Sequence, residues 1–176
     1  MNVKLLGIYL NDHLAGSNAG YELARRAERE NQGNAVGHYL ATFVKELEQE
    51  RAVLEQVMRS LEVSRNDLKQ GLAWVMERLG RLKLNGYLAS YSPLSRMMEL
   101  EALCVAVKGK RCLWTLLERL ARTEPRLAGF DFGALIARSQ AQHQTLDLLR
   151  LQAADTAFVK ATLPAGSSTP VETGAR

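Results

Sequence analysis

Four long segments of the chain repeat apolar residues with the period of an α-helix. Within each segment, aliphatic residues recur at spacings of three and four, which places them on one face of a helix. The segments span residues 2–30, 34–62, 94–122 and 131–162. Alternation of apolar and polar residues, which would indicate strands, never continues for more than a few positions. The sequence therefore predicts an all-α fold.

Turn-forming stretches divide the four segments into two pairs. Residues 31–34, with the sequence NQGN, separate the first two segments, and a loop beginning at Glu124 and Pro125 separates the last two. Connections this short favour antiparallel helical hairpins. A shorter helix, from Ser64 or Asn66 to Leu82, is expected between them. Two antiparallel hairpins with a short extra helix in the long crossover is the topology of ferritin-like four-helix bundles, which is the predicted fold.

Length and composition favour a single domain. The chain has 176 residues, of which 47% are hydrophobic, and this is enough for one sizeable core. We expect a bundle domain over residues 1–163 and a disordered tail over residues 164–176, which are rich in small and polar residues. Neither an apolar run of the roughly 18 residues needed to span a membrane nor a signal peptide is recognisable. The sequence thus predicts a soluble, cytoplasmic protein.

Acidic residues on the apolar stripes are the first candidates for metal chemistry. A ferritin-like di-metal centre takes Glu from two helices and Glu-x-x-His from the other two, and the Glu-x-x-His spacing is absent from this chain. Around a turn centred near residue 32, Asp12 and Glu50 lie at similar distances, so their carboxylates are expected to meet, with Glu46 one turn away. Together with Glu101, these residues suggest a carboxylate-rich site for iron or manganese.

The same acids also suit a structural interpretation. Around a second turn, centred near residue 127, Lys108 is level with Asp147, and His143 lies one helical turn from Asp147. An ammonium group beside carboxylates neutralises them and repels a divalent cation. The sequence therefore favours a polar core that contains Lys108, His143 and Asp147 and fixes the helix register, over a site that holds a metal cofactor.

Motifs of nucleophilic catalysis and of phosphate-cradling loops are absent from the sequence. The net charge of +4 and the pI near 9.2 would suit an anionic partner, and the densest basic patch comprises Arg78, Arg81, Lys83 and Arg96. However, basic and acidic residues are interleaved along nearly every segment, which is typical of solvated helix faces. We therefore expect a non-catalytic bundle with a structural or partner-binding role, assembled as a homodimer, rather than a basic module that binds nucleic acid or another anion.

Three stretches of the sequence carry a resemblance to known proteins. They are YLNDHLAGSNAGYELARRA near the start, VKELEQERAVLEQ in the second segment and RLKLNGYLASYSPLSRMMELEAL before the third. They resemble a group of small, uncharacterised bacterial helical proteins that look ferritin-like. Over residues 1 to about 160 the resemblance implies a four-helix bundle, and it implies no particular activity.

Overall fold

The structure is a computed structural model that describes residues 1–65 and 91–159. These residues form four α-helices: α1 Val3–Glu30, α2 Ala35–Ser60, α4 Pro93–Ala121 and α5 Phe132–Phe158. One 3₁₀ turn, η1 (Pro125–Leu127), lies between α4 and α5. The described ranges contain no strand, so the all-α prediction is confirmed. No helix in those ranges is long and apolar enough to cross a membrane.

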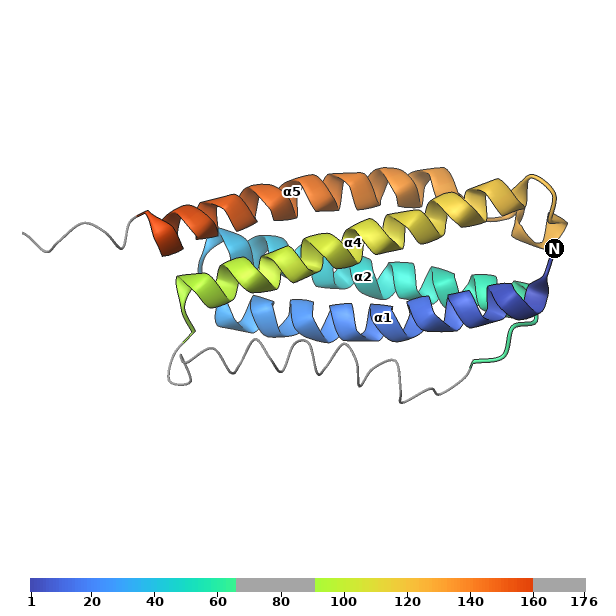
Figure 1. Ribbon diagram of the computed structural model, residues 1–176, viewed down its shortest axis with the longest axis horizontal. Helices are drawn as coiled ribbons and strands as arrows, with labels where there is room; N and C mark the ends of the chain where they lie inside the picture. The colour runs from blue at the N-terminus through green and yellow to red at the C-terminus, as the bar shows by residue number, and fades with distance from the viewer. Residues whose placement is uncertain (66–90, 160–176) are drawn as a thin grey trace, which may run out of the picture.

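The four helices lie side by side in one elongated bundle (Figure 1). The colour in Figure 1 runs in opposite directions along α1 and α2, and again in opposite directions along α4 and α5. Packing is most extensive between α4 and α5 and between α1 and α2, and α4 also packs against α1. The described helices are thus arranged as a four-helix bundle.

Side-chain caps determine where each helix begins. The cap residues are Asn2, Asn34, Ser92 and Asp131, and the side-chain oxygen of each accepts a hydrogen bond from a backbone N–H of the first turn. Such bonds satisfy N–H groups that have no partner within the helix. Pro93 occupies the first position of α4, where a missing N–H costs nothing. These local signals explain why the predicted helix starts agree with the structure to within one or two residues.

The turn between α1 and α2 is tightly packed. Asn31 is fully buried at the end of α1. Gly33 has a φ of +82°, in the left-handed region that favours glycine. A Cβ atom at Gly37 would lie 2.1 Å from the carbonyl oxygen of Asn31. Glycine at position 37 therefore allows α2 to begin this close to the end of α1.

Two clusters of buried apolar side chains fill the bundle, one towards each end. The first contains Leu10, Leu54, Trp114 and Phe132, and the second contains Leu40, Phe43, Leu103 and Leu146. All four helices contribute to at least one cluster, and the middle of each helix lies between the two. The middle of the bundle is therefore where polar side chains can be placed without interrupting either apolar cluster.

Several predictions from the sequence fall outside the described residues. The crossover helix up to Leu82 and the tail 164–176 lie there, as do Arg78, Arg81 and Lys83 of the basic patch. Arg96, the fourth member of that patch, is described, and its side chain bonds to Asn31.

The close approach at Gly37 gives a test of the turn. Because its Cβ would overlap the Asn31 carbonyl, Gly37→Ala should lower the free energy of unfolding by about 2 kcal/mol or more. Gly16→Ala is the matched control: no atom lies within 4 Å of its Cβ, so this variant should gain about 0.5–1 kcal/mol from helix propensity. Urea denaturation measures both. Equal effects of the two substitutions would contradict the packing described for the turn.

Candidate functional site

A layer of polar side chains crosses the middle of the bundle, between the two apolar clusters. Glu50 on α2 is 2% exposed and Gln142 on α5 is 3% exposed. Lys110 on α4 reaches in between them. Its Nζ donates to a carboxylate oxygen of Glu50 and, at 2.6 Å, to Oε1 of Gln142. We call these three residues, together with Glu46, the polar layer.

The amide group of Gln142 connects the polar layer on its other side. Its Nε2 donates to Oε2 of Glu46 at 2.7 Å and to Oε1 of Glu50 at 3.2 Å. Its backbone carbonyl accepts a longer bond, 3.3 Å, from the hydroxyl of Tyr39. Both carboxylate oxygens of Glu50 are therefore bonded, which is the condition under which a buried charge is tolerated. The network joins α2, α4 and α5.

Burial sets the electrostatics of the polar layer. Burial lowers the pKa of the Lys110 ammonium, and the neighbouring Glu50 carboxylate opposes this by favouring the charged form. Burial also raises the pKa of Tyr39, and the negative charge of Glu46 raises it further. The Tyr39 hydroxyl thus keeps its proton and remains a hydrogen-bond donor.

The four predicted metal ligands lie in two different environments, the polar layer and the exposed surface. Glu46 and Glu50 lie together in the polar layer, whereas Asp12 on α1 and Glu101 on α4 are exposed. Within residues 1–65 and 91–159, no group of three or more His, Cys, Asp and Glu side chains is placed to hold a metal ion. The structure therefore does not bring Asp12, Glu46, Glu50 and Glu101 into one site for iron or manganese.

The register of α1 against α2 explains why Asp12 and Glu50 do not meet. The guanidinium of Arg51 donates to Oδ1 of Asn18 at 3.2 Å, so these two residues are level, although the turn itself comprises residues 31–34 and is centred near residue 32 as predicted. In that register, Glu50 is level with the buried Ala19. Asp12 lies seven residues before Ala19, which is about 10 Å along the helix. The register of α1 against α2 is thus offset by about five residues from the one obtained by counting outwards from the centre of the turn.

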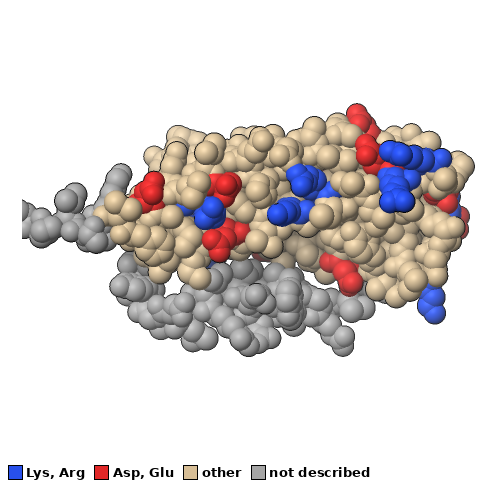
Figure 2. Space-filling model, turned by 45° about the horizontal axis from the view of Figure 1, so that its top comes forward, with Lys and Arg blue, Asp and Glu red and all other residues tan. Residues whose placement is uncertain are grey.

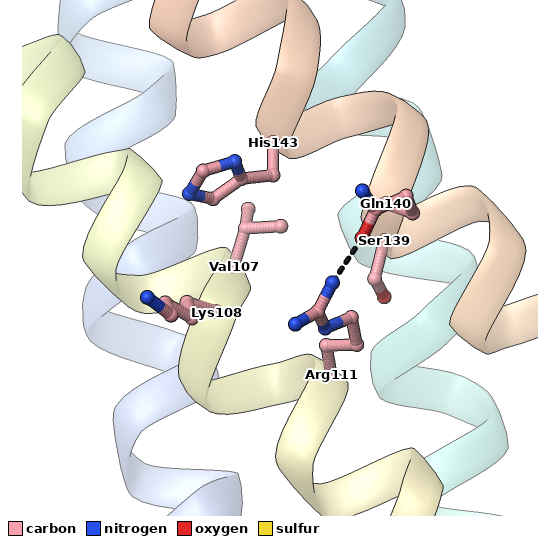
Figure 3. Close-up of a pocket in the computed structure, with 6 residues that line it drawn as sticks. All are labelled: Val107, Lys108, Arg111, Ser139, Gln140 and His143. Carbon is pink, nitrogen blue, oxygen red and sulfur yellow. Dashed lines mark hydrogen bonds between the residues drawn. The ribbon is translucent and has the colours of Figure 1, made fainter.

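The second predicted set, Lys108, His143 and Asp147, also lies away from the polar layer. Lys108 is exposed and lines a surface pocket with His143 (Figure 3). Asp147 accepts from the guanidinium of Arg150 at 2.7 Å. Lys110 takes the place in the core that was predicted for Lys108. The two lysines are two residues apart, or about 200° around the helix, so only one of them can face the core.

The sequence contains a signal that would have identified the missed residues. Lys110 lies three residues after Val107 and four before Trp114, which are both buried. Gln142 likewise lies three residues after Ser139 and four before Leu146, which are also buried. A residue with these spacings belongs to the core-facing stripe. Hydrophobic periodicity therefore identifies Lys110 and Gln142 as residues that face the core. Pairing residues at equal distances from a turn does not.

A second buried acid lies near the turn between α1 and α2. Glu99 on α4 is 3% exposed, and its Oε2 accepts from the hydroxyl of Tyr91 at 2.9 Å. That hydroxyl in turn accepts from the amide of Asn31 at 2.8 Å. Nη2 of Arg26 lies 2.9 Å from Oε1 of Glu99, but no described group donates a hydrogen bond to that oxygen. Burial consequently raises the pKa of Glu99, and the Tyr91 bond and the Arg26 charge offset this only in part.

Comparison with protein-family models, with curated proteins and with solved structures found no match for this chain.

The buried ion pair gives the first test of this site. Lys110→Met leaves the Glu50 carboxylate buried without its cation, so the free energy of unfolding should fall by about 3–5 kcal/mol at pH 7. Lys45→Met, at an exposed position on α2, should change stability by less than about 0.5 kcal/mol. Urea denaturation measures the stability of both variants. Equal stabilities would contradict the role given to the ion pair.

Glu99 gives a test that depends on pH. Its raised pKa means that the folded state binds its proton more tightly than the unfolded state. Its contribution to stability is then greatest below its ordinary pKa of about 4.5 and decreases as the pH rises through the raised value. Between pH 4.5 and pH 7 the wild type should therefore lose stability relative to Glu99→Gln. Glu101→Gln, at an exposed position on the same helix, is the control, and an identical pH profile for all three proteins would refute this role.

Proposed function

We propose that this protein is a non-catalytic, ferritin-like bundle of two antiparallel hairpins that acts by binding a protein partner. The partner that its surface fits best is a second copy of the chain. The observation behind this proposal is that α5 exposes three large apolar side chains on its outer face and also buries apolar residues on its core-facing side.

The outer face of α5 exposes large apolar side chains. Leu148 is 63% exposed, Leu151 is 47% exposed and Phe158 is 58% exposed. Their spacings of three and seven residues place them on one side of the helix. Leu146 and Ala153 on the opposite side are buried in the bundle. A helix with apolar residues on both sides is typical of one that packs on both sides.

The apolar surface continues onto α4. Val105 is 70% exposed and lies one turn from Glu101, whose carboxylate is 3.7 Å from the guanidinium of Arg150. The Glu101–Arg150 pair brings these parts of α4 and α5 next to each other, and Leu151 follows Arg150 directly in the sequence. We call Val105, Leu148, Leu151 and Phe158 the α4–α5 apolar face. Figure 2 looks onto this side of the bundle, where uncharged residues separate small groups of charged side chains.

The charges next to the α4–α5 apolar face favour self-association. Arg150 contacts Asp147 at 2.7 Å and Glu101 at 3.7 Å, so both signs of charge occur side by side. In a two-fold symmetric dimer each patch meets its own copy, and a rim with both signs can be arranged without like-charge repulsion. The exposed Asp155 lies between Leu151 and Phe158 on the same side of α5, so the face combines apolar side chains with charges of both signs. Such a face can meet its own copy in a symmetric dimer.

The polar layer supports a structural role in this proposal. Glu50, Lys110 and Gln142 satisfy one another's hydrogen bonds. A shift of one helix by a turn would separate the two charges and leave each of them buried alone, which is strongly unfavourable. The polar layer accordingly holds the helices in the register that displays the α4–α5 apolar face.

Replacement of the apolar face tests the proposal. Sedimentation equilibrium over a concentration series should show that the wild type forms dimers. The double substitution Leu148→Glu with Leu151→Glu should make the protein monomeric, because two carboxylates would be buried in the interface. The control is Leu5→Glu with Ile8→Glu on α1, where the side chains are 62% and 53% exposed, and this variant should stay dimeric. A wild type that remains monomeric throughout, or equal dissociation of both double variants, would overturn the proposal.

A further inference from the structure

A small pocket opens between α4 and α5, and two of its lining residues, Arg111 and His143, directly follow Lys110 and Gln142 of the polar layer in the sequence. Its volume is about 140 Å³. The lining residues are Val107, Lys108, Arg111, Ser139, Gln140 and His143 (Figure 3). We call it the α4–α5 pocket. It is too small for a whole drug-sized ligand, and its size suits a single polar group of a ligand.

The α4–α5 pocket carries positive charge that no described residue neutralises. Lys108 and Arg111 both line it, and no Asp or Glu is among the lining residues. Neither residue forms an ion pair within the described part of the chain, whereas the neighbouring Lys110 pairs with Glu50 and Arg150 pairs with Asp147. The guanidinium of Arg111 donates instead to the neutral side-chain oxygen of Gln140.

The nitrogen donors of the pocket come from both helices. Figure 3 shows the His143 ring and the Lys108 side chain extending to the same side, with Val107 between His143 and Arg111. Arg111 extends across the gap towards Gln140. Spacings of three residues, from 108 to 111 and from 140 to 143, keep these side chains on the facing sides of the two helices.

We propose that the α4–α5 pocket binds the phosphate group of a small molecule. Lys108 supplies a compact charge, and Arg111 supplies a planar set of N–H donors that matches the oxygens of a phosphate. The imidazole of His143 adds a ring nitrogen. A phosphate carries more negative charge than a carboxylate, so it gains more from two uncompensated cations. This site is distinct from the α4–α5 apolar face and goes beyond the dimer proposed above.

Histidine resonances provide a site-specific test on the full-length protein. The chain has three histidines, and His143 is the one that lines the pocket; His13 packs against Tyr9 and His38 is exposed on α2. Inorganic phosphate, titrated at constant pH and ionic strength against chloride, should shift the ring-proton signal of His143 to saturation and leave the other two in place. His143→Gln identifies the signal. No shift, or equal shifts of all three signals, would overturn the proposal.

Variants of the two cations complete the test. Lys108→Met with Arg111→Gln should weaken phosphate binding by about tenfold or more, because two charged donors are lost. Lys45→Met with Arg119→Gln removes the same charge at exposed positions outside the pocket and should bind like the wild type. Glycerol 3-phosphate in place of inorganic phosphate distinguishes the source: tighter binding indicates an organic phosphate ester, and equal binding indicates the free ion. Unchanged phosphate affinity in the Lys108 and Arg111 variant would refute the assignment.

Discussion

Lys110 and Glu50 are opposite charges placed in the middle of a bundle that is apolar on both sides of them. Leucines at spacings of three and four can interdigitate in several registers that differ by about one helical turn, at similar cost. The ion pair and the Gln142 amide do not tolerate such a shift, because each alternative register leaves a buried charge without a partner. The alignment of α2, α4 and α5, and hence every surface that they build, depends on this contact.

The orientation of Lys110 also determines what its neighbours do. Because this lysine faces the core, Lys108 and Arg111 are directed to the seam with α5, where they meet His143 and Gln140. Within the short sequence Lys108–Arg111, Lys110 therefore belongs to the polar layer, while Lys108 and Arg111 line the pocket on the surface. On α5 the same division holds: Gln142 faces the polar layer while Leu148 faces outwards. The rotation of each helix about its own axis thus decides both which residues face the core and which are exposed on the surface.

Local signals in the sequence were sufficient for the helices and insufficient for their alignment. Apolar periodicity predicted the helices, and of the acidic residues noted on the apolar stripes Glu50 is buried. The pairing of Asp12 with Glu50 depended instead on the centre of a turn. The Arg51–Asn18 contact puts α1 and α2 in a register about five residues away from the one obtained by counting from that centre, and no local pattern encodes this offset.

The central claim is that the polar layer selects one helix register. The most direct measurement is an amide ¹H–¹⁵N NMR spectrum of the triple variant Glu50→Leu, Lys110→Met and Gln142→Leu. An all-apolar layer of similar size keeps the bundle folded. The account predicts a helical protein whose spectrum shows more than one set of signals, or broadened signals, for residues of α2, α4 and α5. A single sharp set with the wild-type contacts between α2 and α5 would contradict it.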